Sequence, residues 1–351
     1  MSSALRSGPS QSGGASNLLK YHRRRQSLRP GIKEHIPVLT KESRLCLKNL
    51  ASHKPRFLHH VMKKVPRERC AAVLVALFVG RKGDLYVLLS RRSSTLRTYA
   101  GDTSLPGGKV EVTDRSFEDT ARREAFEEIG LPPDKQKVLL LCTLDPFLAG
   151  NALVVVPVVV LVLDKTIRPI LNASEVAQLF SHPLASFLSS TPPYSEAELS
   201  DMIPYHTTVD YPWEGPGPGP ASHLAMPPTP SVSTPSPTPS APTTLSPDPH
   251  ADVELAEDTS PHKRKRRRMV RMHRFLTGRE AGGTKPVFGL TAAILIHTAT
   301  IGYGRRPEFE VNPPGAPSWR ERIEWALAKH PGFRLAHSQA TTSRLKRESR
   351  L

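Results

Sequence analysis

Cysteine is scarce in this chain of 351 residues, which has three thiols, at Cys46, Cys70 and Cys142. Their spacing fits no metal-ligand motif and three are too few for a disulfide framework, so a reducing compartment fits best. A long apolar run is also missing, because the most apolar stretch, 151–163, falls short of the roughly 20 residues that a spanning helix needs. The N-terminus lacks the continuous apolar core of a secretory signal. We therefore expect neither a membrane span nor a secreted scaffold.

Acidic residues are absent from 1–33, where arginine and lysine alternate with serine and glycine. This composition is typical both of a mitochondrial transit segment and of a disordered basic tail, which we place at 1–35. The whole chain carries a formal net charge of +17. Such a charge favours anionic partners, namely nucleic acid, anionic lipid or phosphorylated small molecules.

Large apolar residues are nearly absent from 215–261, where proline, serine and threonine repeat. A segment of this kind cannot bury enough surface to offset its ordering entropy. We predict a disordered insertion over 213–268 that ends in the basic run Lys263–Arg268. This run is typical of a solvated linker, and it lacks the aromatic residues that stack on bases. A nuclear signal or a phosphate-binding patch is the alternative.

The apolar pattern predicts an α/β domain. Strands are expected at 70–79 and 85–90, joined as a hairpin, and at 137–144 and 152–163. Helices are expected near 42–50, 172–180 and 287–299, with order resuming at 270–277 after the insertion and a further possible helix at 318–329. We place the domain at 36–300, with its core at 66–212 and 270–300, and assign 301–351 to a basic C-terminal tail.

One predicted helix carries clustered carboxylates. Ser116 is followed three residues later by Asp119, a helix-start pattern, and Gly130 marks the end about four turns on. Between them, Glu124, Glu127 and Glu128 have the spacing i, i+3 and i+4, which places them on one face. Because such a cluster is costly, it is expected to hold a hard divalent cation.

The alternative is a solvated acidic face, and the surrounding pattern decides between the two. Gly107-Gly-Lys109, a spacer and then Arg123-Glu-Ala-Phe-Glu-Glu-Ile-Gly-Leu131 resemble the Nudix box. The resemblance implies a Nudix fold, in which a mixed β-sheet lies between α-helices. It also implies that Glu124, Glu127 and Glu128 bind Mg²⁺ or Mn²⁺, with the carbonyl of Gly108 as a further candidate ligand. Arg123 would orient the glutamates, and Glu127 and Glu128 would be catalytic together with it.

The spacer points to one branch of this family. Gly108 and Arg123 are fifteen positions apart, one more than usual, and Asp114 stands where a glutamate is common. Upstream, 88–101 resembles the motif of the coenzyme A diphosphatases, with matches at Arg92, Ser93, Leu96, Arg97 and Gly101 and departures at Ser90, Tyr99 and the following Asp102. The segments 172–184 and 288–292 also resemble this branch, most of all its fungal peroxisomal members.

This likeness implies hydrolysis of the diphosphate bond of coenzyme A or of its acyl or oxidised derivatives, which gives 3′,5′-ADP and 4′-phosphopantetheine. Arg92, Arg97 and Lys109 are the candidate substrate contacts, since cationic side chains bind phosphate; they are otherwise surface charges. A Nudix enzyme that removes oxidised nucleotides such as 8-oxo-dGTP is the second hypothesis. A nucleic-acid-binding protein that uses the basic run is a third, which the sequence disfavours.

The last three residues, Ser349-Arg350-Leu351, resemble the peroxisomal address Ser-Lys-Leu. They predict a peroxisomal location and binding to the peroxisomal import receptor. The arginine-rich N-terminus keeps the mitochondrion as the alternative.

Overall fold

The computed structural model describes Ala15, Leu18 and residues 39–96, 99–164, 166–193, 204–214, 268–277 and 285–334. Its helices are α1 (Lys41–Ser52), α2 (Leu58–Met62), α3 (Phe117–Ile129), α4 (Gly289–Tyr303) and α5 (Trp319–Lys329), with 3₁₀ turns at Arg67–Arg69 and Leu184–Leu188. Its strands are β1 (Cys70–Val79), β2 (Leu85–Arg92), β3 (Thr103–Ser104), β4 (Gly107–Lys109), β5 (Val138–Thr143), β6 (Phe147–Leu148), β7 (Val154–Val162), β8 (Val176–Pro183), β9 (His206–Pro212), β10 (Met269–Thr277) and β11 (Lys285–Phe288).

The main sheet is mixed. Its strands follow the order β3-β2-β1-β7-β5, with β4 paired to β1, β6 to β7 and β8 to β2. The central pair β1 and β7 is parallel, and the other pairs are antiparallel. Strand β7 continues through Pro157, whose carbonyl accepts a hydrogen bond from the N–H of Leu144 at 3.0 Å. The predicted strands at 70–79, 85–90, 137–144 and 152–163 are confirmed.

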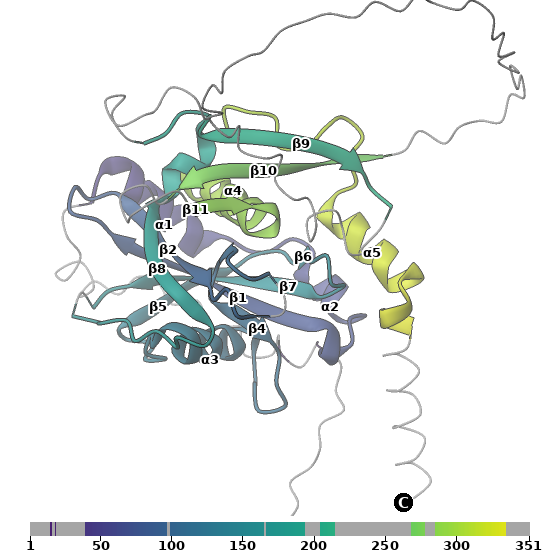
Figure 1. Ribbon diagram of the computed structural model, residues 1–351, viewed down its shortest axis with the longest axis horizontal. Helices are drawn as coiled ribbons and strands as arrows, with labels where there is room; N and C mark the ends of the chain where they lie inside the picture. The colour runs from purple at the N-terminus through teal and green to yellow at the C-terminus, as the bar shows by residue number, and fades with distance from the viewer. Residues whose placement is uncertain are drawn as a thin grey trace, which may run out of the picture.

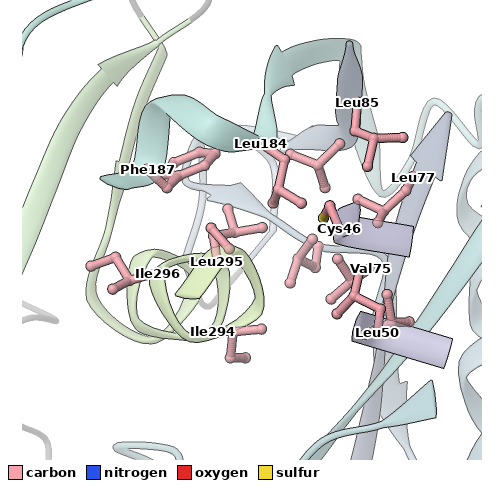
Figure 2. Close-up of a cluster of buried hydrophobic side chains, with 14 of the residues drawn as sticks. Cys46, Leu50, Val75, Leu77, Leu85, Leu184, Phe187, Ile294, Leu295 and Ile296 are labelled. Carbon is pink, nitrogen blue, oxygen red and sulfur yellow. The ribbon is translucent and has the colours of Figure 1, made fainter. Parts of the chain in front are cut away.

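Helices cover both faces of this sheet, as Figure 1 shows. Alternate residues of the central strands point to opposite faces. Val75 and Leu77 of β1 join a core that includes Leu50 of α1 and Leu295 of α4, and Figure 2 shows these side chains together. Leu74, Ala76, Val158 and Val160 instead pack with residues of α3. The α/β class, with its sheet between helices, is therefore confirmed.

A second, three-stranded sheet has the order β11-β10-β9. It lies over α4, which contacts both β10 and β11 (Figure 1). Strand β9 was not predicted, because 206–212 is polar and half exposed. The strand that pairs with it, β10, follows only after the long segment 215–267.

The predicted helix at 172–180 is wrong. Asn172 begins a turn, with its side-chain oxygen accepting from the N–H and hydroxyl of Ser174, and β8 follows from Val176. β8 pairs with β2 over its whole length, so hydrogen bonding to a distant strand overrides the local helical pattern. The predicted helices at 42–50, 287–299 and 318–329 are present as α1, α4 and α5.

Helix α5 lies within the stretch assigned to a basic tail. Ile323 and Ala326 of this helix are completely buried in the same core as α3. The division of the chain at 300 stays a prediction, although that position falls inside α4. The segments 1–14, 215–267 and 335–351 lie outside the described residues, and so do the disorder predictions made for them. In the described part of the chain, no helix is long and apolar enough to span a membrane.

Candidate active site

Helix α3 positions the candidate catalytic side chains, and both of its predicted ends are confirmed. The hydroxyl of Ser116 accepts a hydrogen bond from the N–H of Asp119 at 3.0 Å, which caps the first turn. Gly130 ends the helix in a left-handed conformation with φ of 66°. The buried face of α3 includes Phe117 and Ala121, and it packs on the sheet.

Arg123 donates hydrogen bonds to several acidic groups of the candidate site. Its Nε and Nη2 donate to the two carboxylate oxygens of Asp114 at 3.0 and 3.1 Å. Its Nη1 donates to Glu124 at 3.0 Å and to Glu127 at 3.1 Å. Nη2 also donates to the carbonyl of Lys109 at 3.0 Å. One guanidinium group therefore ties α3 to β4 and to the loop between them.

Asp114, which the sequence marks only as a departure from the common motif, holds Arg123 in place. Besides Arg123, its carboxylate accepts from the N–H of Glu111 at 2.8 Å and from the hydroxyl of Thr120 at 2.9 Å. Burial would raise the pKa of Asp114, but these hydrogen bonds outweigh it and lower the pKa below its ordinary value. The same contact with Asp114 raises the pKa of Arg123. Both groups are therefore held in their charged forms.

Glu124 lies against the backbone of Gly108. A Cβ atom at position 108 would overlap the carboxylate of Glu124, so only glycine fits there in this arrangement. Burial raises the pKa of Glu124; Arg123 opposes this, and the charges of Glu127 and Glu175 add to it.

Glu128 is the most enclosed of the three glutamates, with 4% of its surface exposed. Its Oε2 accepts from the N–H of Gly107 at 3.2 Å, and its Oε1 lies 4.0 Å from Nη1 of Arg92. Burial raises the pKa of Glu128 to about 8; the N–H of Gly107 opposes this shift, and the charge of Glu124 adds to it.

The donor set fits a cation in part. Glu124 and Glu128 are carboxylates whose charged forms are disfavoured by burial and by neighbouring carboxylates, and a bound cation would relieve this. Glu127 differs, because half of its side chain is exposed and it pairs with Arg123. No group of three acidic, histidine or cysteine side chains within the described ranges is arranged to hold a metal ion. Glu124, Glu127, Glu128 and Gly108 therefore stay predicted ligands.

The predicted substrate contacts lie in different places. Arg92 is partly buried at the end of β2, beside Glu128. Lys109 exposes its side chain and contributes its carbonyl to Arg123. Arg97 lies outside the described residues. The structure thus brings Arg92, but not Lys109, into contact with a predicted metal ligand.

The family model described as "NUDIX domain" matches residues 68–204, a range that includes β1 to β8 and α3. The chain therefore contains a Nudix domain, as its sequence motif predicted.

Among curated relatives, the chain is similar to "Nudix hydrolase 15, mitochondrial" of Arabidopsis thaliana, with 49% identity over 34% of this chain and 41% of that protein. It is 45% identical to "Peroxisomal coenzyme A diphosphatase 1, peroxisomal" of Saccharomyces cerevisiae, over 27% of this chain and 28% of that one. A peroxisomal coenzyme A diphosphatase of Mus musculus is 39% identical over 33% of this chain and 48% of that one. The chain thus spans less than half the length of these relatives.

Proposed function

We propose that this protein is a Nudix diphosphatase that hydrolyses coenzyme A or its acyl or oxidised derivatives. Water would add to one phosphorus of the diphosphate, the bridging P–O bond would break, and a proton would be released. The products would be 3′,5′-ADP and 4′-phosphopantetheine or its acyl form. Two observations together support this proposal: the Nudix domain at 68–204 and the similarity of the chain to two coenzyme A diphosphatases.

The site residues have physical roles consistent with this reaction. Arg123 fixes the rotamers of Glu124 and Glu127 by donating to both, and Asp114 fixes Arg123 in turn. Glu124, Glu127 and Glu128 would hold Mg²⁺ or Mn²⁺ with the carbonyl of Gly108. When bound, such an ion neutralises charge that develops on phosphate oxygens and lowers the pKa of bound water.

Arg92 would bind the diphosphate beside Glu128. Its distance of 4.0 Å from that carboxylate is too long for a strong pair, which leaves guanidinium donors for phosphate.

A substrate panel tests the proposal. The full chain is incubated with Mg²⁺ or Mn²⁺ and with coenzyme A, its dephospho form, NADH, ADP-ribose or 8-oxo-dGTP, and products are separated by chromatography. We expect the highest kcat/KM for coenzyme A, with Glu128→Gln at least about 100-fold slower. A clear preference for 8-oxo-dGTP would instead establish the oxidised-nucleotide hypothesis, and intact substrates throughout would refute both.

We further propose that the protein acts in peroxisomes. Two similar relatives are named as peroxisomal, and Ser349-Arg350-Leu351 resembles the peroxisomal address Ser-Lys-Leu. The mitochondrion is the alternative, since another similar relative is named as mitochondrial. A fluorescent fusion at the N-terminus should lose its punctate peroxisomal signal when the final tripeptide is deleted. An unchanged distribution would exclude this address.

A further inference from the structure

A cavity of about 380 Å³ lies at the end of β2, beside the candidate active site. Its walls come from β2 and the loop after it and from β8: Arg91, Arg92, Ser94, Gly101, Ala177 and Gln178. The volume is within the range of sites for small molecules. Among the described residues, the two arginines are the charged groups that line it, so the cavity favours an anionic group.

A β-bulge in β8 lies opposite the two arginines of β2, at the wall of the cavity. Here Arg91 pairs with Gln178 while Arg92 pairs with Val176, so Ala177 is an extra residue on β8. Bulges re-aim side chains and occur often beside active sites.

The two arginines have different surroundings. Nη1 of Arg92 faces Glu128 at 4.0 Å, and the charge of Arg92 also opposes the pKa rise that burial causes in Asp102. The Nε of Arg92 is buried without a hydrogen-bond partner in the described part of the chain. Arg92 therefore lies beside Glu128 of α3, and its Nε is left as a donor for a ligand.

Arg91 faces no carboxylate within the described ranges. Its one hydrogen bond there runs from Nε to the carbonyl of Gly101 at 3.3 Å, which leaves most of its five N–H donors for solvent or a ligand. A second positive charge is close by, since burial and the charge of Arg91 both lower the pKa of Lys285. The Arg91 side of the cavity is thus more positive than the Arg92 side.

We propose that this cavity binds, through Arg91, a phosphate monoester of the substrate that is separate from the diphosphate under attack. The proposal rests on the proposed function and narrows its substrate class. In coenzyme A the group would be the 3′-phosphate, which dephospho-coenzyme A lacks. Arg92, next to Glu128, serves the diphosphate, while Arg91 supplies a planar pair of donors that matches the second phosphate.

The test compares two substrates in matched variants of the full chain. We measure kcat/KM for coenzyme A and for dephospho-coenzyme A with the wild type, Arg91→Gln, Arg91→Lys and Arg81→Gln. Arg81 is an exposed arginine in the turn at the opposite end of β2, so it controls for loss of one surface charge. We expect Arg91→Gln to lower the preference for coenzyme A at least about tenfold, mainly through KM. Arg91→Lys should give an intermediate ratio, and Arg81→Gln should keep the wild-type ratio.

A proportional loss with both substrates in Arg91→Gln, or an unchanged ratio, would overturn the proposal. If the protein hydrolyses neither substrate, the proposed function fails, but the phosphate site can still be tested by a binding measurement. Calorimetry on the wild type should show tighter binding of 3′,5′-ADP than of 5′-AMP, and Arg91→Gln should remove most of this difference. Equal affinities in the wild type would refute the role of Arg91.

Discussion

Arg123 binds Asp114 through two parallel hydrogen bonds of 3.0 and 3.1 Å, across the loop that leads from β4 into α3. The same guanidinium donates to Glu124 and Glu127. The aspartate therefore fixes the arginine that in turn orients two of the three glutamates.

Asp114→Asn should weaken both the fold and catalysis. The substitution removes the charge that pairs with Arg123 and leaves a partly buried guanidinium without its main partner. We expect a loss of about 2 kcal/mol in the free energy of unfolding and at least about tenfold in kcat. Urea denaturation and steady-state kinetics measure these. Asp134→Asn, at an exposed turn, is the control and should behave as wild type. Wild-type behaviour of Asp114→Asn would contradict the role of this pair.

Gly108→Ala should displace Glu124. The added methyl group would occupy the space of the Glu124 carboxylate, so activity should fall at least about tenfold and stability by about 1–3 kcal/mol. The double variant Gly108→Ala with Glu124→Ala removes the overlap. Its stability loss should be clearly smaller than the sum of the two single losses, as a double-mutant cycle would measure. Additive losses would mean that the methyl group clashes elsewhere.

Glu128→Gln should stabilise the protein in EDTA while abolishing turnover. Glu128 is a buried carboxylate near Glu124, and burying such a charge costs free energy that a neutral amide avoids. The amide oxygen can still accept from the N–H of Gly107. We expect a gain of about 1 kcal/mol in urea denaturation at pH 8. A less stable variant would show that the buried charge is already well compensated.

Acid should destabilise the fold through His182. This ring is completely buried, its Nε2 lies 2.8 Å from the hydroxyl of Tyr205, and burial lowers its pKa from 6.5 to about 3. Between these values the unfolded chain takes up a proton that the folded protein does not. Stability is thus fully present above pH 6.5 and falls as pH drops toward 3, by up to about 1.4 kcal/mol per pH unit.

His182→Gln should reduce that slope, and His59→Gln, at an exposed position, should not. Urea midpoints between pH 7 and pH 5 give the comparison. Equal slopes in the wild type and His182→Gln would show that other groups govern the acid sensitivity.

The sequence predicted what depends on local or periodic signals. The ends of α3 follow from Ser116 and Gly130, and the buried strands follow from their apolar runs. Local patterns mislead where a distant partner decides the structure, as for β8, whose pairing with β2 replaces the expected helix. The burial of Glu128 and the bulge at Ala177 also depend on segments far apart in the chain, and no local pattern signals them.

The N–H of Trp213 donates to the carbonyl of Arg268 at 2.8 Å, just beyond the paired ends of β9 and β10. Positions 213 and 268 are therefore neighbours in space although 54 residues of sequence lie between them. A change in the number or kind of those residues need not move β9, β10 or the chemistry at α3.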